Sequence, residues 1–418
     1  MTKIAFYTLG CKSNQYETEA MKSQCPTLEI VPFNSKADIY VINTCTVTSD
    51  ADKKSRQAIR KALKNDQSAQ VVVTGCYSEL CARELEKEFP GIRLLKIQDK
   101  KELLKHIYSH TKTPRPSRWG FGVGIYLPKE NSQCHFKEGR VRRNLMVEDG
   151  CENFCSYCIV PYARGKVRTL PIGEVVEEAN KMVDSGCREI VLTGINLGEF
   201  KELPALITEL NNIASLSRVR LSSIEPMYVT DELIAAVAGT PKTCRHLHVP
   251  LQSGDDGVLK AMNRNYCLDD YKKIIEKARK NIPECAITTD IIVGLPGEGP
   301  TAFENTKNAV EEIGFSRIHI FTYSPRKGTA AAKMPEQVDP KTKKQRYDIL
   351  NKSREKLMRQ FAEKYLEKEV EVLIEQPGEG LTHNYIRVKS KEINEDIGKI
   401  ITIKITSVEK DFCIGENV

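Results

Sequence analysis

Short apolar runs alternate with polar, helix-length stretches through the first 110 residues of the chain. The apolar runs, which we expect to be strands, are Lys3–Gly10, Leu28–Phe33, Asp38–Val47 and Gln70–Tyr77. The stretches that we expect to be helices are Asn14–Ser23, Asp50–Asn65, Ser78–Phe89 and Lys100–Ser109. Apolar strands that alternate with helices are typical of an open parallel sheet with helices on both faces. The pattern predicts an N-terminal α/β domain over residues 1–110.

The alternation stops between residues 111 and 136, where prolines, glycines and the only tryptophan, Trp119, occur. Since Pro and Gly interrupt regular elements, we expect residues 111–136 to be a linker between domains. Residues 111–143 hold eight Lys or Arg and two acids, a local charge of +6. Such a basic stretch is typical either of a contact with nucleic acid or of a solvated, extended linker.

Six further apolar runs follow the linker, and a helical stretch comes after each of them. The runs are Asn144–Asp149, Glu189–Gly194, Arg218–Glu225, His246–Leu251, Ala286–Gly294 and Arg317–Tyr323. Six successive β–α units predict a partial (β/α)6 barrel of the TIM type, two units short of the closed form. We place this domain at residues 137–366, and its end overlaps a long charged helix expected at Lys341–Lys368.

The C-terminal fifty or so residues, 367–418, contain only short apolar runs separated by glycines. The runs are Val370–Ile374, Tyr385–Val388, Ile400–Ile405 and a last one at Cys413. Short strands in a segment of this length suit a small β-barrel of the OB-like kind. The fold class predicted for the whole chain is therefore α/β, with a small β-barrel at its C-terminus.

Composition narrows the chemistry of the chain. No run of 18 apolar residues occurs, which argues against a transmembrane helix, and the apolar start is too short for a secretory signal. We therefore expect a cytoplasmic protein without a membrane partner. The chain has 14 cysteines, and disulfides are rare in a reducing compartment. Cysteines in this number favour metal ligation or catalysis.

Three cysteines, Cys151, Cys155 and Cys158, form a Cys-x3-Cys-x2-Cys set directly after the first strand of the predicted barrel. Loops at the carboxyl ends of barrel strands form active sites, and three thiolates can hold three irons of a [4Fe–4S] cluster. One iron then stays open for another ligand. The alternative is a zinc site completed by His135 or Cys187. The spacing resembles that of the radical S-adenosylmethionine superfamily, which implies that the open iron binds S-adenosylmethionine.

A second set of cysteines is spread along the first domain. Cys11, Cys45 and Cys76 each follow a predicted parallel strand. The carboxyl ends of such strands converge on one crevice of an open α/β sheet, so these three thiols can meet. They would form a second [4Fe–4S] site with one open iron, although three unrelated buried thiols are the simpler alternative.

Two three-cysteine sets, an α/β domain before them and a small β-barrel after them together resemble the methylthiotransferases. The resemblance covers essentially all 418 residues and implies a C-terminal TRAM domain that binds tRNA. It maps one [4Fe–4S] cluster onto Cys11, Cys45 and Cys76, and the radical cluster onto the other three cysteines. It also implies a tRNA anticodon arm as substrate, two S-adenosylmethionine molecules per turnover, a sulfur donor, and an electron donor such as flavodoxin or ferredoxin.

Short sequence motifs indicate the branch within that family. Thr8-Leu-Gly-Cys-Lys-Ser-Asn-Gln-Tyr-Glu-Thr-Glu19 and Pro161-Tyr-Ala-Arg-Gly165 are similar to the branch that acts on N6-threonylcarbamoyladenosine of tRNA. That resemblance implies conversion of this nucleoside, at position 37 beside the anticodon, to its 2-methylthio derivative. Other members act on isopentenyladenosine or on an aspartate of a ribosomal protein. A two-cluster, RNA-binding redox protein without turnover is the alternative from another class.

The resemblance also places residues of the cofactor pocket. Tyr157 occupies a position that is usually aromatic and close to the adenine. The other expected pocket residues are Gly194, Glu225, Gln252 and Arg264, all at strand ends or in the loops that follow. Polar residues of the barrel rim without a catalytic role would look the same.

Three further groups of polar residues follow from position alone. Arg164, Lys166 and Arg168 come directly after the radical cysteines, which suggests contacts to tRNA phosphates. His246 and His248 share one side of a strand, as either a metal pair or a hydrogen-bonded pair inside the barrel. Asp290 is expected to be an acid of the barrel interior.

Overall fold

The computed structural model describes residues 1–108, 140–393 and 396–418, so the predicted linker at 111–136 lies outside the described residues. The chain divides into two compact units. The first comprises Met1–Glu138, Met146–Phe154 and Cys158–Pro171, and the second comprises Gly139–Leu145, Cys155–Tyr157 and Ile172–Val418. Among the described residues, no helix is both long and apolar enough to cross a membrane.

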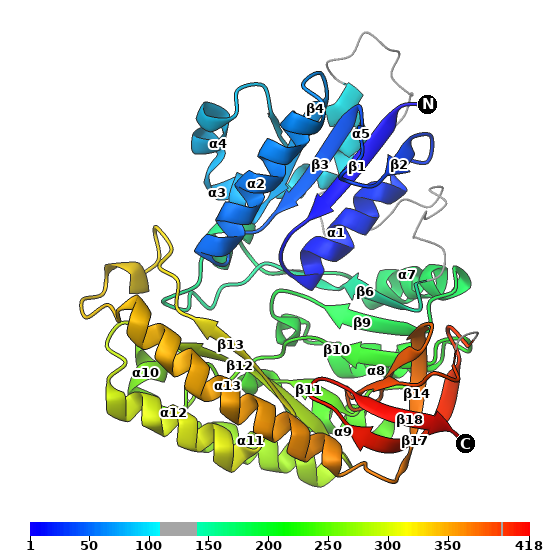
Figure 1. Cartoon of the computed structure of the whole chain (residues 1–418), viewed down its shortest axis with the longest axis vertical. Coiled ribbons are helices and arrows are strands. Elements are labelled where there is room, and N and C mark those ends of the chain that lie inside the picture. The colour runs from blue at the N-terminus through cyan, green and yellow to red at the C-terminus, as the bar shows by residue number, and fades with distance from the viewer. Residues whose placement is uncertain (109–139, 394–395) are drawn as a thin grey trace. The chain divides into compact units, whose positions relative to one another are not determined.

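The first unit is built on an open sheet of five parallel strands in the order β2-β1-β3-β4-β5, which confirms the predicted sheet (Figure 1). Its strands are β1 (Lys3–Thr8), β2 (Glu29–Val31), β3 (Ile39–Thr44), β4 (Gln70–Gly75) and β5 (Arg93–Leu94). Its helices are α1 (Lys12–Ser23), α2 (Ser49–Asn65), α3 (Cys76–Leu80), α4 (Ala82–Glu88) and α5 (Leu103–Tyr108). The short elements β7 (Glu148–Asp149), α6 (Val160–Arg164) and β8 (Arg168–Thr169) complete it.

Helices cover both faces of this sheet because successive residues of each strand point to opposite sides. One core joins Ala5 of β1 to Ile59 of α2 and Leu85 of α4. The other joins Ile4 to Met21 of α1 and Leu103 of α5. Since both faces of the central strands are covered, β1, β3 and β4 are mostly apolar in their middle positions, which is why they could be found from the sequence.

Two predicted helices of the first unit differ from the structure. The helix expected at Ser78–Phe89 is divided at Cys81 into α3 and α4, because the Cys81 backbone (φ −120°, ψ 31°) leaves the helical range. The helix expected at Lys100–Ser109 is preceded by a 3₁₀ turn over Ile97–Glu102 and begins as α-helix at Leu103. The two-residue strand β5 was not predicted, since a run of that length gives no periodic signal.

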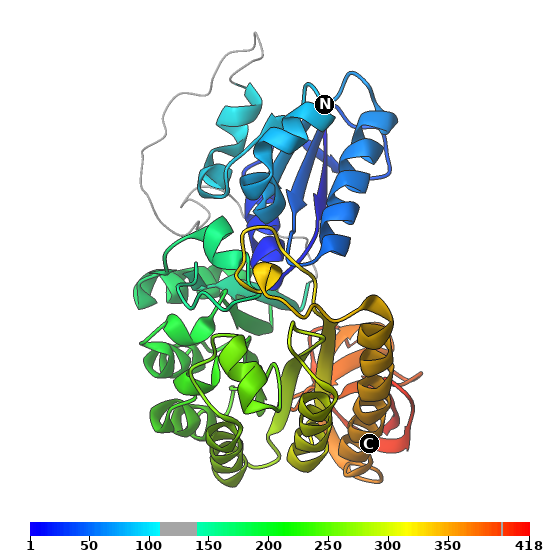
Figure 2. The same cartoon turned by 90° about the vertical axis from the view of Figure 1, so that its left-hand side faces the viewer.

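The second unit contains the six predicted barrel strands in an open arc (Figures 1 and 2). Strands β6, β9 and β10 form one three-stranded sheet and β11, β12 and β13 form another. Parallel bridges from Val219 to Thr243 and from Ser223 to His248 join the two sheets between β10 and β11. The strands are β6 (Arg142–Met146), β9 (Glu189–Thr193), β10 (Arg218–Leu221), β11 (His246–His248), β12 (Ala286–Val293) and β13 (Arg317–Thr322). The partial (β/α)6 barrel is confirmed.

Helices follow these strands along the chain. They are α7 (Ile172–Asp184), α8 (Leu203–Asn211), α9 (Asp231–Gly239), α10 (Asp256–Ala261), α11 (Leu268–Asn281), α12 (Pro300–Ile313) and α13 (Pro340–Glu363). Short 3₁₀ turns lie at Leu197–Glu199, Pro226–Tyr228 and Ala331–Lys333. The long charged helix predicted at Lys341–Lys368 is α13, which ends earlier, at Glu363.

The C-terminal segment is a closed barrel in the order β14-β15-β16-β18-β17, as predicted. Its strands are β14 (Glu369–Gln376), β15 (Glu379–Thr382), β16 (Arg387–Lys389), β17 (Ile400–Val408) and β18 (Cys413–Asn417). Strand β15 was not predicted, because its Gly380 looks like a turn residue. A side chain at Gly380 would collide with the Leu373 carbonyl on the neighbouring strand, so this glycine is required by close strand packing.

Two buried arginines of β10 fasten the small barrel to the (β/α)6 strands within the second unit. Arg218 Nη2 donates to the Glu371 carbonyl at 3.0 Å, and Arg220 Nη1 donates to the His383 carbonyl at 3.1 Å. Arg220 Nε is also 2.7 Å from Oε1 of the buried Glu189. These charged hydrogen bonds satisfy the carbonyls of Glu371 in β14 and of His383, which follows β15.

This junction makes the stability of the protein sensitive to acid. Burial, followed by the charges of Arg218 and Arg220, lowers the pKa of His383 from 6.5 to about 4. Between those values the unfolded chain binds a proton at His383 that the folded chain does not, so the free energy of unfolding falls as pH falls. We expect the urea midpoint of wild type to drop more between pH 7 and pH 4.5 than that of His383→Gln. Parallel pH profiles of the two proteins would contradict this.

Candidate functional site

The three dispersed cysteines lie at the carboxyl ends of three adjacent parallel strands in the first unit. Cys11 caps the start of α1 after β1, Cys45 follows β3, and Cys76 begins α3 after β4. Gly10 adopts φ +98°, and a Cβ there would lie 2.8 Å from Cys45 Sγ. Cys11 and Cys76 are both near enough to contribute, after burial, to the raised pKa of Cys45, and Cys11 contributes to that of Cys76. The convergence predicted from topology is therefore present.

The thiols of this triad differ in exposure. Cys11 is exposed, whereas Cys45 and Cys76 are buried. Burial raises the pKa of Cys45 to about 11 and also raises the pKa of Cys76. A buried thiol becomes a thiolate only when a cation replaces its proton, so this donor set suits a soft metal centre.

A buried network of charges lies beside the triad, within the first unit. Glu17 accepts from Arg164 Nη1 at 2.9 Å and is also paired with Lys100. Arg164 Nη1 is 2.7 Å from Asp149 Oδ1, and Lys100 Nζ donates to Asn43 at 3.0 Å. Burial alone would raise the pKa of Glu17, but the charges of Arg164 and Lys100 outweigh it and lower this pKa to about 2. The network therefore stays charged at neutral pH.

Arg164 was predicted to contact tRNA phosphates, and that prediction is wrong. Its side chain is 0% exposed and binds Glu17 and Asp149. Arg168, which is partly exposed, also pairs with Asp149, at 2.6 Å. Lys166 is exposed, so its contact with tRNA phosphates stays a prediction. Charge density along a sequence cannot separate solvated cations from buried ones, because only the fold places Glu17 opposite Arg164.

The other three cysteines lie on the loop that follows β7. Cys151 N donates to the Gly165 carbonyl at 3.1 Å, a contact inside the first unit. Within the second unit, Arg264 Nη1 lies 3.3 Å from Cys155 Sγ, and Ser156 N donates to the Met262 carbonyl at 2.9 Å. These three thiols are partly exposed, which leaves them accessible to a metal centre.

The structure brings several predicted pocket residues of the second unit together. Arg264 pairs with Glu225 (Nη1 to Oε1, 3.0 Å), and Tyr157 lies close enough to Arg264 to influence its pKa. Burial raises the pKa of Glu225, and the Arg264 charge opposes that rise. Glu225 thus has a partner other than the predicted cofactor hydroxyl or amino group. Tyr266, which we did not single out, holds Arg264 Nε at 3.1 Å.

The remaining predicted pocket residues occupy strand ends. Gly194 directly follows β9, as expected. Gln252 is buried with φ +67°, and its backbone bridges to β12 through Asp290 O at 2.8 Å and Ile292 N at 2.9 Å. The roles of Gly194 and Gln252 toward a cofactor stay predictions.

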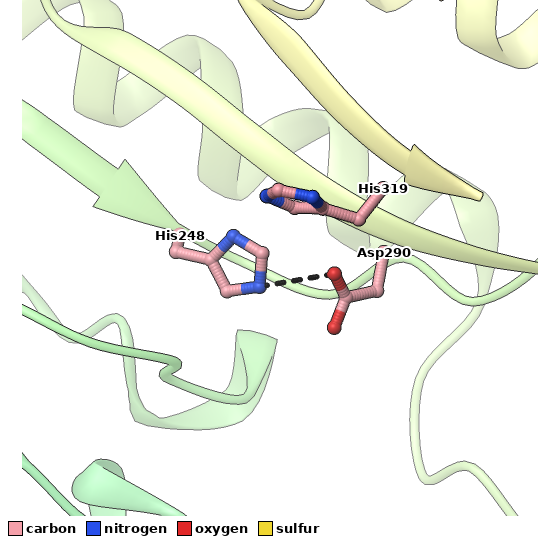
Figure 3. A group of neighbouring side chains, drawn as sticks. All are labelled: His248, Asp290 and His319. Atoms are coloured by element: carbon pink, nitrogen blue, oxygen red, sulfur yellow. Dashed lines mark ion pairs between the residues drawn. The ribbon is translucent and has the colours of Figure 1, made fainter. Parts of the chain in front are cut away.

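The polar residues of the barrel interior form a row of neighbouring side chains along β11 and β12. Thr288 Oγ1 is hydrogen-bonded to His246 Nε2 at 2.9 Å and to His248 Nδ1 at 2.8 Å. The two histidines are thus linked through the Thr288 hydroxyl and not bonded directly to each other. His248 Nε2 also lies 3.3 Å from Asp290 Oδ1, and His319 is next to both (Figure 3).

Sequence reasoning missed the partners of these residues. Glu17, Asn43 and Lys100 form the network beside the 11/45/76 cysteines. His319 lies next to the polar residues of β11 and β12 in the barrel. Glu17 lies in α1 one turn after Asn14, so a polar face directly behind Cys11 was the available signal. His319 is a lone histidine in an apolar run, and nothing local distinguishes it.

Two family models match the chain. Residues 146–310 match the Radical SAM superfamily, and residues 3–96 match the Uncharacterized protein family UPF0004. Curated relatives include the threonylcarbamoyladenosine tRNA methylthiotransferase MtaB of Bacillus subtilis (37% identical, 100% of this chain and 97% of the relative). The enzyme of the same name from Thermotoga maritima is 35% identical over 99% and 97% of the two chains.

The chain belongs to the radical S-adenosylmethionine methylthiotransferase family. It is therefore an enzyme of that class. Radical S-adenosylmethionine enzymes bind a [4Fe–4S] cluster and S-adenosylmethionine, and methylthiotransferases of this kind use two clusters. The two three-cysteine sets fit that requirement in number and donor chemistry. Which cysteines bind which cluster stays a prediction.

Solved structures support the fold of the methylthiotransferase. The radical S-adenosylmethionine methyltransferase TsrM of Kitasatospora setae aligns with a TM-score of 0.59 at 15% identity, over 79% of this chain and 77% of that chain. The cobalamin-dependent S-adenosylmethionine radical enzyme OxsB aligns with a TM-score of 0.53 at 11% identity, over 87% and 56%. At these identities the likeness concerns the fold alone.

Proposed function

We propose that this chain converts N6-threonylcarbamoyladenosine beside the anticodon of tRNA, at position 37, to its 2-methylthio derivative. The observation that carries the proposal is the convergence of Cys11, Cys45 and Cys76 in a chain that also has the radical cysteine loop. Each set offers three thiolates, so each cluster keeps an iron open for a further ligand. An electron carrier would instead be expected to use four thiolates per cluster.

The residues of the chain then have separate tasks. Cys151, Cys155 and Cys158 hold the radical cluster, and the other three cysteines hold the second. When bound, the clusters and S-adenosylmethionine supply the radical that removes an unactivated C2 hydrogen and the sulfur and methyl groups that replace it. Arg264 is held by Glu225 and Tyr266 beside Cys155 and positions that thiolate. Tyr157, Gly194 and Gln252 complete the S-adenosylmethionine pocket.

The choice of nucleoside rests on the relatives. Five curated relatives at 33–37% identity carry the threonylcarbamoyladenosine name. Others at 31–32%, from Endomicrobium trichonymphae and Dictyoglomus thermophilum, are named tRNA-2-methylthio-N(6)-dimethylallyladenosine synthase. The higher identities favour the threonylcarbamoyl substrate. The sequence motifs around Cys11 and Arg164 favour the same substrate.

Contact with RNA is supported by two exposed aromatic rings in the first unit. Phe154 on the radical loop is 50% exposed and Tyr162 of α6 is 52% exposed. Their rings lie edge to face with centroids 5.8 Å apart. Exposed aromatic rings are platforms on which single-stranded bases stack, and an anticodon loop offers such bases. The exposed Lys166 adds a cation nearby in the chain.

The remaining assignments complete the proposal. Residues 1–110 form the methylthiotransferase N-terminal domain, 111–136 a linker, 137–366 the radical S-adenosylmethionine core and 367–418 a TRAM domain that binds tRNA. The enzyme works in the cytoplasm with a sulfur donor and with an electron donor such as flavodoxin or ferredoxin. Two S-adenosylmethionine molecules are used per turnover.

Nucleoside mass spectrometry of total tRNA tests the proposal. We compare cells that carry the gene with cells that lack it, and with cells that carry a Cys151→Ala version. Deletion and the variant should both remove 2-methylthio-N6-threonylcarbamoyladenosine and cause its unthiolated parent to accumulate.

Two other results would redirect the assignment. Loss of the dimethylallyl analogue instead would keep the chemistry and change the nucleoside. An unchanged set of tRNA nucleosides would overturn the tRNA substrate and favour a protein aspartate or a non-catalytic role.

A further inference from the structure

Three side chains from three successive barrel strands face one another on the inner wall of the second unit. His248 comes from β11, Asp290 from β12 and His319 from β13, and Figure 3 shows them pointing toward one another. One ligand atom from each lies within 4.8 Å of the other two. Parallel register explains the meeting, because Asp290 is directly opposite His319 and Thr288 is opposite His248.

We propose that His248, Asp290 and His319 form a binding site for one divalent transition-metal ion, such as Zn²⁺. This set shares no residue with the six cysteines or with the cofactor pocket proposed above. Two imidazoles and one carboxylate are donors that suit Zn²⁺ and its neighbours, and three protein ligands leave coordination positions open.

The spacing of two of the donors already matches a shared ion. His248 Nε2 and Asp290 Oδ1 are 3.3 Å apart. Two ligands that each bind a tetrahedral ion at about 2.0 Å are about 3.3 Å from each other. An ion between them would thus need little movement of β11 or β12, and His319 would complete the set by a rotation of its side chain.

A supporting residue behind His248 orients its ring. The Nδ1 atom of His248 is hydrogen-bonded to Thr288 Oγ1 at 2.8 Å, so the Nε2 atom is the one directed at Asp290. Metal-binding histidines almost always use their other ring nitrogen in this way, which fixes the tautomer and the orientation of the ring.

Local charge favours a cation over an anion at this position. Asp290 carries a negative charge, and the Glu225 carboxylate is close enough to Asp290 and His248 for their charges to affect it. Arg264 is already paired with Glu225, so the group keeps one unbalanced carboxylate. The side chains of His248 and Asp290 are 15% and 25% exposed and His319 is also partly exposed, which gives an ion a route of entry.

Zinc binding to the full-length protein with both clusters assembled tests this site. Equilibrium dialysis against Zn²⁺, with zinc and iron counted by mass spectrometry, should give one zinc per wild-type chain that is absent in His319→Ala and in Asp290→Asn. We expect an affinity loss of at least about 100-fold in these variants, and about 10–100-fold in Thr288→Val. His106→Ala, which removes an imidazole from the first unit, is the matched control and should bind zinc as wild type does.

His319 is only partly buried, so we expect His319→Ala to fold and to keep the iron content of wild type. A lower iron content would reveal a folding defect. Mn²⁺ titration followed by electron paramagnetic resonance gives a second count, because Mn²⁺ avoids thiol ligands. Equal zinc binding by wild type and His319→Ala would overturn the site, as would the lack of any saturable zinc in wild type. None of these measurements uses RNA, so a failure here would leave the proposed tRNA reaction untouched.

Discussion

Replacing Cys151, Cys155 and Cys158 together by alanine is expected to abolish formation of 5′-deoxyadenosine from S-adenosylmethionine. The matching replacement of Cys11, Cys45 and Cys76 is expected to leave that cleavage and to stop sulfur transfer to tRNA. The reason is that only the 151/155/158 set would hold the cluster that binds S-adenosylmethionine. Each triple variant should keep about half of the iron, that is about four atoms per chain in place of about eight.

The two products are measured in parallel by liquid chromatography and mass spectrometry on anaerobically reconstituted protein. A double variant, Cys81→Ala with Cys267→Ala, is the control, because both thiols are partly exposed and lie outside the two sets. It should keep both products and all of the iron. Cleavage that survives loss of the 151/155/158 set would show that the radical site has been assigned to the wrong cysteines.

Arg164→Ala is expected to lower the free energy of unfolding of the first unit by about 3–5 kcal/mol. The substitution leaves Glu17 and Asp149 with buried carboxylates and removes the cation that both of them face. Lys100 still pairs with Glu17. An alanine at position 164 cannot replace the guanidinium, which contacts Glu17 and Asp149 at the same time. Urea unfolding of the full chain, followed by circular dichroism, measures the loss.

Arg168→Ala provides the matched control for this experiment. Arg168 also pairs with Asp149, but its side chain is 37% exposed, so its removal should cost about 1 kcal/mol or less. If Arg164→Ala and Arg168→Ala unfold at the same urea concentration, the buried network does not stabilise the first unit.

The network also bears on the chemistry of the first triad. Arg164 and Lys100 act on the ionisation of Cys76, where their positive charges oppose the effect of burial. A cluster bound there would carry the negative charge of three thiolates, and fixed cations at this distance stabilise that charge. The iron content of Arg164→Ala therefore reports on assembly at the same time as its stability is measured.

Much of this protein was determined by its sequence. The central strands of the first sheet are covered on both faces, so their middle residues are mostly apolar, and β1, β3 and β4 were located to within three residues. The cysteines were found because each comes directly after such a strand, and parallel topology then requires the strand ends to meet. The three radical cysteines needed no topology, since eight consecutive residues contain them. In each case the information is local in the chain or repeats with a regular period.

Only the tertiary structure decided which polar groups face one another. Arg164 looked like a solvated cation beside Lys166 and is instead enclosed by Glu17 and Asp149, since burial of a charge depends on partners far away in the chain. His319 gave no signal in its own strand, and only the register of β12 and β13 sets it opposite Asp290. Pairings between distant residues depend on strand order and register, which a pattern of hydrophobic and polar positions does not contain.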